Sequence, residues 1–387
     1  MIKIEKKNCC GCTACYSACP KAAIQMLPDE EGFVYPIVNE KLCIECGLCE
    51  RVCPMINAPA VSEKYAGCAV IQSIEEEVLN ESTSGGFVDA LCRYVLENMQ
   101  GYAAGVVYDE NLLPTHVITN AYDSAKAFRN SKYAQSNLHN IFNNIKVLLD
   151  KEEKVVFVGT PCQVAGLKAF LRKEYANLIT VDFVCRSVPS PKLWRLYLDW
   201  QENRHRSKIK KVTCRKKTYG YHSGALEIEF ENGKHYAGSN RVDYYMKAFH
   251  HDICSRPSCY DCHFKTKHRC SDFTVFDSWK PEAVTGEALV DDDKGYSNII
   301  VHTDKGKKLL YQIDKVTIAE GNSEEMFRFT GGMESKSIEL CDKRKTFYTD
   351  LEAFGFYHTV KKYINVSIID CAIEFLKPIR YYFKQKK

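Results

Sequence analysis

Between residues 154 and 200 the hydrophobic pattern changes twice from a short continuous run to helical spacing. The run Val155–Val158 is typical of a buried strand, and the apolar positions of Gln163–Arg172 fit one face of a helix. Thr160 and Pro161, an N-cap residue and a proline at the first helical position, separate the two. The same order then repeats, which predicts a second strand over residues 178–184 and a second helix that begins at Ser190-Pro191.

Two cysteines lie at the ends of these predicted strands. A strand–helix–strand crossover is right-handed and makes its two strands parallel. Cys162 begins the first helix and Cys185 follows the second strand. Both are therefore expected at the carboxyl edge of the sheet, where ligands bind in open α/β folds.

The pattern elsewhere predicts more of the same domain. Strands are expected over residues 64–70 and 298–303, and a short helix is expected to open at Lys305-Gly306. Ser84-Gly85-Gly86 precedes a helical run over Phe87–Met99. Backbone N–H groups at such a turn can hold a phosphate, although a plain helix cap explains these residues equally well. Residues 57–63 are small and polar and are expected to form a linker.

Composition limits the classes of function. The chain has 387 residues, 45% of them hydrophobic, which suits two or three folded units. A formal net charge of +4 is too small to indicate a nucleic-acid partner. We find no secretory signal pattern and no run of about 18 apolar residues, so we expect a cytoplasmic protein that does not cross a bilayer.

Cysteine is the informative residue type, because nine of the 20 cysteines lie within the first 53 residues. This clustering indicates metal ligation rather than a disulfide framework. The run C-x2-C-x2-C-x3-C-P occurs twice, and in proteins with two [4Fe–4S] clusters the fourth cysteine of each run ligates the other cluster. The two clusters are therefore assigned to Cys9, Cys12, Cys15 and Cys53, and to Cys43, Cys46, Cys49 and Cys19.

Other features of these runs fit the same interpretation. Gly11 and Gly47 are expected where the backbone passes close to a cluster. Cys10 is expected to be a bystander rather than a ligand. A pair of zinc sites is the alternative, but a doubled four-cysteine run with proline is not the usual zinc pattern.

A second group of cysteines, Cys254, Cys259, Cys262 and Cys270, has three interpretations. The four can form a self-contained zinc site. Cys259 and Cys262 can instead join Cys162 and Cys185 around a third [4Fe–4S] cluster, which we favour, and structural thiols are the remaining alternative.

The segment after Tyr363 is amphipathic and basic. Ile369, Ile373, Leu376 and Ile379 recur at helical spacing, with Pro378 among them, and the basic residues are Lys377, Arg380, Lys384, Lys386 and Lys387. Such a segment can make peripheral contact with a membrane or an acidic partner. A helix packed on the protein's own core is the favoured alternative.

Taken together, the motifs resemble the coenzyme F420 hydrogenase/dehydrogenase beta-subunit family with an N-terminal ferredoxin extension. The resemblance covers residues 1 to about 335. Besides the cysteine runs, it is carried by Asp29–Pro36, Ser84-Gly85-Gly86, Ser131–Ser136, Gly159–Lys168, Val188-Pro189-Ser190 and Arg256–Cys262.

The resemblance implies an α+β ferredoxin-like module over residues 1–58 and an α/β FAD-binding domain with a mixed or parallel sheet over residues 64–335. Outside the resemblance, the pattern predicts a helical, basic C-terminal tail over residues 336–387. The resemblance also implies positions near the flavin: Ser84, Gly85, Gly86, Ser131, Lys132, Tyr133, Gln135, Ser136, Thr160 and Gln163, with Arg215 or Lys216 as a phosphate or substrate contact. No catalytic residue is assigned. Two departures bear on the substrate: Arg186-Ser187 stands where the family has His-Gly, and Asp277-Ser278-Trp279-Lys280 where it has Asp-Phe-Trp-Gly.

The function that follows is an iron–sulfur flavoprotein oxidoreductase. A flavin exchanges two electrons as a hydride and clusters pass them singly, so the expected partners are a ferredoxin-like donor or acceptor, or another redox subunit, and a small substrate. Coenzyme F420 and a sugar or polysaccharide precursor are the candidate substrates. The alternatives are a non-catalytic electron-transfer subunit and a zinc-stabilised interaction protein that carries a ferredoxin module.

Overall fold

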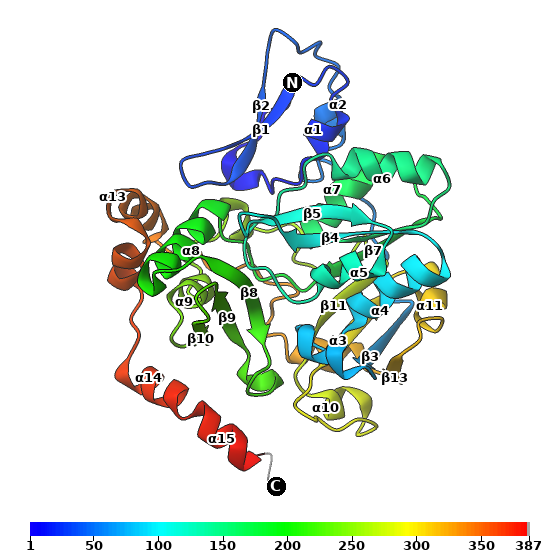
Figure 1. The fold of residues 1–387 in the computed structure, drawn as a ribbon. Helices are drawn as coiled ribbons and strands as arrows, with labels where there is room; N and C mark the ends of the chain where they lie inside the picture. The colour runs from blue at the N-terminus through cyan, green and yellow to red at the C-terminus, as the bar shows by residue number, and fades with distance from the viewer. Residues whose placement is uncertain (385–387) are drawn as a thin grey trace.

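The computed structural model describes residues 1–384 and places a small N-terminal module on one end of a larger α/β body (Figure 1). The body is built on an eight-stranded mixed sheet. Its strands, in order across the sheet, are β13 (Val316–Glu320), β3 (Gly67–Ser73), β12 (Tyr296–Val301), β11 (Phe273–Ser278), β7 (Leu178–Phe183), β6 (Val155–Val158), β4 (Tyr102–Tyr108) and β5 (Pro114–Thr119). The predicted parallel pairing of β6 with β7 is confirmed.

Helices cover both faces of this sheet. The strand β6 shows this, since its alternate residues are buried on opposite sides. Val156 and Val158 pack with α4 and α11, whereas Val155 and Phe157 pack with α6 and α7. The helices of this part are α3 (Glu76–Glu81), α4 (Phe87–Arg93), α5 (Tyr122–Ala125), α6 (Ile141–Asp150), α7 (Pro161–Leu171), α10 (Pro281–Thr285), α11 (Asp304–Leu310) and α12 (Ser323–Arg328).

A second, antiparallel sheet stands beside the first. Its strands are β8 (Ile209–Lys216), β9 (Ala225–Phe230) and β10 (His235–Gly238), and it packs with α8 (Pro191–His205), α9 (Tyr244–His250) and α13 (Arg344–Tyr363). The core between them is aromatic, with Trp194, Tyr197 and Tyr245 almost fully buried. Sequence analysis did not identify this sheet.

The N-terminal module consists of a hairpin and two short helices. The hairpin pairs β1 (Ile24–Pro28) with β2 (Val34–Val38), and α1 (Ala14–Ala18) and α2 (Leu48–Arg51) each follow a cysteine loop. Phe33, at the entry to β2, is fully buried in the same core as Trp194. The module is thus anchored in the body, and the guanidinium of Arg344 on α13 adds an ion pair with Glu31 (Nη1–Oε1 2.8 Å).

The predicted elements are present, with shifts of a few residues. The strand expected over 64–70 is β3, which begins at Gly67, and the strand expected over 298–303 is β12, which begins two residues earlier. The helical run over 87–99 is α4 followed by a π-helical turn at Tyr94–Asn98. Thr160 forms a capping box with Gln163, and Ser190 caps α8, as their sequence positions predicted.

The C-terminal segment differs from the favoured prediction. Residues Arg344–Tyr363 form α13, which is part of the aromatic core. Beyond it, α14 (Ile368–Phe375) and α15 (Lys377–Lys384) lie on the outside of the body (Figure 1). α14 buries no residue, so the prediction of a helix packed on its own core is wrong here. Lys386 and Lys387 lie outside the described residues. Across residues 1–384, no helix has the length and apolar content that a membrane span requires.

Candidate functional site

The first cysteine loop surrounds a cavity at the base of the N-terminal module. Cys9, Cys12, Cys15 and Cys53 line it, together with Cys10 and Met55. Cys53 follows α2, so the fourth thiol arrives from the second cysteine run. The structure therefore brings together the four cysteines assigned to the first cluster.

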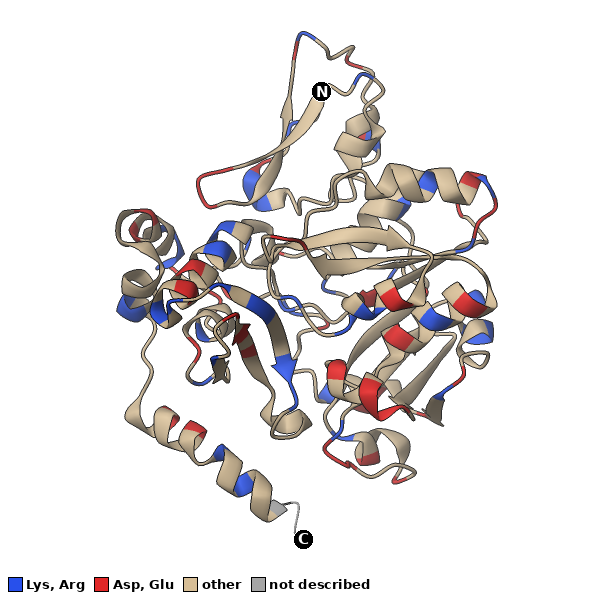
Figure 2. Cartoon of the chain, viewed as in Figure 1, with Lys and Arg blue, Asp and Glu red and all other residues tan. Residues whose placement is uncertain are grey.

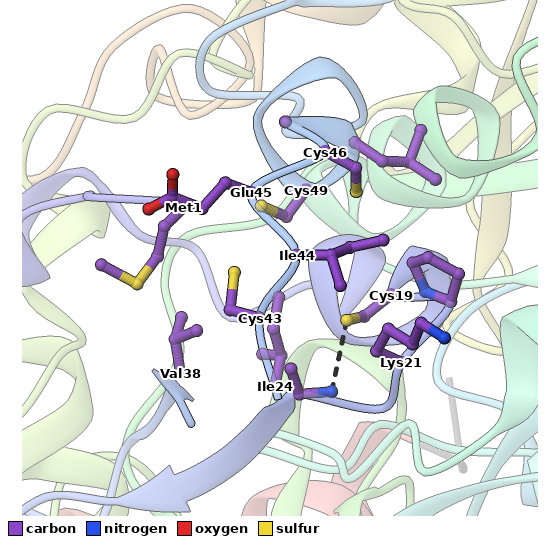
Figure 3. A pocket seen from close by; sticks show the side chains of 14 residues that line it. Met1, Cys19, Lys21, Ile24, Val38, Cys43, Ile44, Glu45, Cys46 and Cys49 are labelled. Atoms are coloured by element: carbon purple, nitrogen blue, oxygen red, sulfur yellow. Dashed lines mark hydrogen bonds between the residues drawn. The ribbon is translucent and has the colours of Figure 1, made fainter. Parts of the chain in front are cut away.

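The second cavity lies at the outer end of the module (Figure 3). It is lined by Cys43, Cys46 and Cys49, and by Cys19 from the first run. Cys19 accepts a hydrogen bond from the backbone N–H of Ala23 (3.3 Å), and Ile24 and Val38 of the hairpin close the apolar wall. The exchange of the fourth cysteine between the two runs is thus reproduced in the folded chain.

Glycine lets both loops turn. Gly11 and Gly47 adopt φ values of +71° and +68°, a left-handed conformation that side chains disfavour. Gly11 is also confined by space, because a Cβ atom there would lie 2.6 Å from Nε2 of Gln135 and 3.0 Å from the guanidinium carbon of Arg256. The first loop is therefore shaped to fit against the body.

A third cavity lies in the body next to the first. Cys162 at the start of α7, Cys185 after β7, and Cys259 and Cys262 after α9 all line it. Cys10 and Met55 line both the first and the third cavity, so these two side chains form the wall between them. Cys162 and Cys185, which lie at the carboxyl edge of the parallel strands, thus line the same cavity.

The self-contained zinc set is not assembled. Cys254 is fully buried in the aromatic core, where its carbonyl accepts a hydrogen bond from the Tyr348 hydroxyl (2.7 Å). Cys270 packs on the other side, near α6 and α7. Only Cys259 and Cys262 of this set reach the third cavity.

The thiols are spaced around cavities rather than gathered at a point. In the part of the chain that the structure describes, no three His, Cys, Asp or Glu side chains are grouped so as to hold a single metal ion. A [4Fe–4S] cluster is wider than one ion and takes its ligands from four directions, which the three four-cysteine cavities provide. The residues present fit clusters better than zinc.

Burial keeps the free thiols protonated. It raises the pKa of Cys15 and of Cys185 to about 12. Hydrogen bonding to Cys12 and burial raise the pKa of Cys10 well above its ordinary value, and its thiol also contacts Cys162. Metal ligands must be thiolates, so loading these sites releases protons.

Cations surround the third cavity. Arg186, Arg256, Lys265 and Arg269 all line it. Arg186 is paired with Asp252 (Nε–Oδ1 2.8 Å) and Arg269 lies near Asp182 (3.6 Å). Within residues 1–384, Lys265 and Arg256 form no ion pair, and they donate to backbone carbonyls and to an amide oxygen instead. Two uncompensated positive charges therefore face a site that would hold an anionic, thiolate-bound cluster.

Arg256 joins the module to the body. Its Nε donates to the Cys9 carbonyl (2.7 Å), Nη2 to the Val34 carbonyl (2.9 Å) and Nη1 to Oε1 of Gln135 (2.8 Å). The side chain is 1% exposed and lies over the Tyr35 ring (4.3 Å). The sequence placed Arg256 in a motif but gave no signal for these distant partners.

We refer to the candidate flavin positions from Ser84 to Gln163 as the polar strip; they form two hydrogen-bonded groups, and Thr160 of the second group lines the third cavity. Ser84 shares a hydrogen bond with Ser297 (2.7 Å), and the Gly85 N–H donates to the same Ser297 hydroxyl (2.9 Å). Ser131 contacts Thr83 (2.9 Å). The Gly85-Gly86 turn is packed tightly, since a Cβ atom on Gly85 would lie 2.1 Å from the Ile71 carbonyl oxygen.

Further along the strip, Gln163 links two candidate positions. Its amide donates to the Ser136 hydroxyl (3.0 Å) and its oxygen accepts from the Thr160 N–H (2.9 Å). Ser136 also contacts His116 (3.1 Å), and burial lowers the pKa of His116 to about 4, so this imidazole is neutral near pH 7. Gln135 is used by Arg256, as described above.

Three predicted cationic positions differ in their surroundings. Lys132 donates to the carbonyls of Arg129 (2.9 Å) and Asn130 (3.2 Å), and burial lowers its pKa to about 8. Arg215 makes a two-pronged ion pair with Asp277 (3.2 and 3.3 Å), beside the ring of Tyr133. Lys216 lies on β8 and has no side-chain hydrogen bond in the described part of the chain. The charge of Arg215 is thus already balanced.

Lys217, which the sequence analysis did not single out, is held more firmly than Lys216. Its ammonium donates to the carbonyls of Leu79 (2.8 Å), Ser84 (2.7 Å) and Lys294 (2.6 Å), and burial lowers its pKa to about 8. It therefore ties the Ser84 turn to β8. No local pattern distinguishes it from its lysine neighbour.

Comparison with known proteins agrees with this arrangement. Residues 152–325 match the family model for the C terminus of the coenzyme F420 hydrogenase/dehydrogenase beta subunit, and residues 2–61 match the 4Fe–4S dicluster domain. A coenzyme F420-dependent sulfite reductase of Methanocaldococcus jannaschii is 28% identical over 331 residues, which are 84% of this chain and 48% of that protein.

Two more distant similarities are found. One component of the F420H2 dehydrogenase of Methanosarcina mazei is 20% identical over 193 residues, 47% of this chain and 54% of that protein. A chain of the F420-reducing [NiFe] hydrogenase complex from Methanosarcina barkeri aligns with a TM-score of 0.48 and 19% identity, over 76% of this chain and 94% of that one. This chain spans about half the length of the two relatives named first. Its residues 152–325 belong to the coenzyme F420 hydrogenase/dehydrogenase beta-subunit family, and its residues 2–61 form a 4Fe–4S dicluster domain.

Proposed function

We propose that the protein is an iron–sulfur flavoprotein oxidoreductase that passes electrons along a row of three [4Fe–4S] clusters to or from FAD. The observation that carries this proposal is the sequence of three four-cysteine cavities, of which the first and third share the wall formed by Cys10 and Met55. Electrons pass between clusters only when the clusters lie close together, as these cavities do. The transfer does not require the ligands to move.

The residues of the chain have distinct parts in this proposal. Cys162, Cys185, Cys259 and Cys262 hold the third cluster, and the unpaired charges of Arg256 and Lys265 offset its negative charge. The strip from Ser84 to Gln163 binds the flavin. FAD bound there supplies the exchange of a hydride for two single electrons.

Electrons enter or leave at the outer end of the module. Cys46 at the second cavity is exposed, and the neighbouring Leu42 and Ile44 are 51% and 58% exposed. Apolar surface around a cluster suits brief docking of a ferredoxin-like protein or another redox subunit. For the hydride, coenzyme F420 is the first candidate, because both named relatives carry it in their names, and a sugar or polysaccharide precursor is the second.

One observation favours the alternative of an electron-transfer subunit without flavin. Lys132, Lys217 and Arg215 already have protein partners, so within the described residues only Lys216 of the predicted cationic positions is left for a phosphate. Extraction of the purified protein distinguishes the two: about one FAD per chain supports the oxidoreductase, and its absence leaves the electron-transfer subunit.

The cluster assignment is tested by paired cysteine variants of the full chain, purified without oxygen. Three clusters predict roughly twelve iron atoms and twelve sulfides per chain. C162S is expected to lose about four of each, whereas C254S, which changes a fully buried thiol outside the cavity, keeps them. If the wild type instead held about eight iron atoms together with zinc, and C254S lost that zinc, the third cluster would be refuted and the first two would stand. Anaerobic titration with reduced coenzyme F420 and with reduced ferredoxin then identifies the electron donor by bleaching of the absorbance.

A further inference from the structure

The C-terminal helices α14 and α15 turn their polar side toward the protein. Asp370 pairs with Lys247 of α9 (3.0 Å), and Glu374 accepts from the hydroxyl (2.6 Å) and backbone N–H (3.1 Å) of Ser239. Lys377 in turn pairs with Glu374 (3.0 Å). These residues are three and four positions apart and so share one face. Charged groups fasten α14 to the body, and α15 contacts it through the ring of Tyr381, whose centroid lies 6.0 Å from that of Tyr219.

The outer side of the same helices is apolar. Its large side chains are more exposed than the charged ones: Ile368 is 89% exposed and Phe375 79%, against 21% for Asp370 and 19% for Glu374. The other exposed apolar residues are Ile369, Leu376, Ile379, Tyr382 and Phe383. A surface helix of a globular protein normally buries its apolar face, so this segment is inverted.

The charges that remain on the outer side are positive. Both carboxylates of α14 are occupied by the body, and from Phe375 to the last residue the sequence contains no Asp or Glu. Arg380 is exposed and has no side-chain ion pair within residues 1–384. Figure 2 shows the acidic positions on α14 and the basic ones on α15.

We propose that residues 368–384 form a docking strip for an anionic lipid surface. An exposed row of apolar side chains next to the uncompensated charge of Arg380, in a stretch whose sequence adds only basic charges, is a combination that places a helix in the interface of an anionic bilayer. Two eight-residue helices give a strip roughly 24 Å long, which suits an interfacial helix but offers little area for a stable protein partner. The strip anchors the redox body at a membrane surface while the polar contacts fix its orientation.

Vesicle co-sedimentation of the full, cluster-loaded chain tests this proposal. The protein is expected to bind vesicles of phosphatidylcholine with phosphatidylglycerol, and not phosphatidylcholine alone, and to be released by salt. The double change F375D/I379D removes apolar contact and is expected to lower the partition coefficient more than tenfold. R380E is expected to lower it roughly fivefold or more.

Matched variants control for a general effect of charge. V290D changes a residue that is 76% exposed elsewhere on the body, and K307E changes an exposed lysine of α11; both are expected to bind like the wild type. Cluster absorbance confirms that every variant is folded. Failure to bind the anionic vesicles, or equal binding by F375D/I379D, would overturn the proposal. So would a dimer in sedimentation velocity that F375D/I379D converts to monomer, because the strip would then join two copies of the chain.

Discussion

At the scale of single residues, Arg256 shows how the two parts of the chain depend on each other. Burying a charged guanidinium costs free energy, and that of Arg256 is 1% exposed. Its hydrogen bonds to two carbonyls of the module and to Gln135 of the body offset this cost. The same charge borders the third cavity. One side chain thus serves attachment and electrostatics together.

Replacing Arg256 tests this dual role. R256Q leaves the buried carbonyls of Cys9 and Val34 without donors, so we expect the free energy of unfolding to fall by about 3 kcal/mol. Loss of the positive charge is also expected to lower the reduction potential of the nearby clusters in a titration monitored by electron paramagnetic resonance. R328Q, on an exposed arginine that pairs only with Glu325, is the control and should change stability by less than about 0.5 kcal/mol. Equal behaviour of the two variants would refute the role of Arg256.

Cys10 offers a second test at this scale. It lies between two cavities and contacts Cys12 and Cys162, yet the assignment makes it a wall residue rather than a ligand. We expect C10A to retain all iron and acid-labile sulfide, whereas C12A loses about four atoms of each. Iron loss in C10A equal to that in C12A would show that Cys10 binds metal.

The sequence predicted the cysteine groups well and the polar residues around them less well. Fixed spacing grouped the eight N-terminal cysteines, and strand ends together with the Cys259–Cys262 pair grouped the other four; all twelve line the three cavities. By contrast, the partners of Arg256 lie more than 100 positions away in the chain, and no local pattern encodes them. The same holds for Lys217 and for the Arg215–Asp277 pair.

At the scale of elements, the turn at Ser84-Gly85-Gly86 depends on contact as much as on backbone freedom. Gly85 touches the backbone of β3 at Ile71 and of β12 at Ser297, and Gly86 has a φ of +86°. The turn therefore locks the start of α4 onto two neighbouring strands.

G85A is expected to force these strands apart, with a loss of roughly 3 kcal/mol in stability and of any bound flavin. Thermal unfolding and flavin extraction measure the two effects. G233A is the control without a clash: Gly233 has a left-handed φ of +78°, which Gly85 lacks, and no atom lies within 4 Å of an added Cβ, so its expected cost is the backbone cost of about 1 kcal/mol alone. If G85A were no worse than G233A, the close packing would be unimportant.

Elements bounded by caps were predicted more accurately than those without them. Thr160-Pro161 and Ser190-Pro191 fix the starts of α7 and α8, and β6 has its predicted bounds. The three-stranded sheet was missed although Leu226, Ile228 and Phe230 alternate inward along β9, because charged residues dominate its sequence. Likewise, no sequence pattern reveals that α14 turns its apolar side outward, since that depends on Lys247 and Ser239.

At the scale of the whole molecule, the N-terminal module has little core of its own. Its inner cluster is small and consists of Ile2, Ile24, Cys15 and Cys53. So small a core needs further stabilisation, which metal clusters provide.

Removal of the clusters by chelation at mild acid pH should therefore unfold the module first. Limited proteolysis with mass spectrometry is expected to show rapid cleavage within residues 1–56 of the apoprotein, while fragments from the eight-stranded sheet persist. The loaded protein treated in parallel serves as the control. Cleavage that begins in the body, or that is the same with and without clusters, would contradict this order.

Gly166 on α7 has a consequence for engineering. An added Cβ there would lie 2.7 Å from Cβ and 2.8 Å from Sγ of Cys12, so the helix of one part and the cysteine loop of the other are fitted to each other. A foreign dicluster ferredoxin grafted in place of the first 56 residues would meet a surface shaped for this particular loop. Chimeras that transplant the module together with α7 preserve that fit, and exchanges at the linker alone do not.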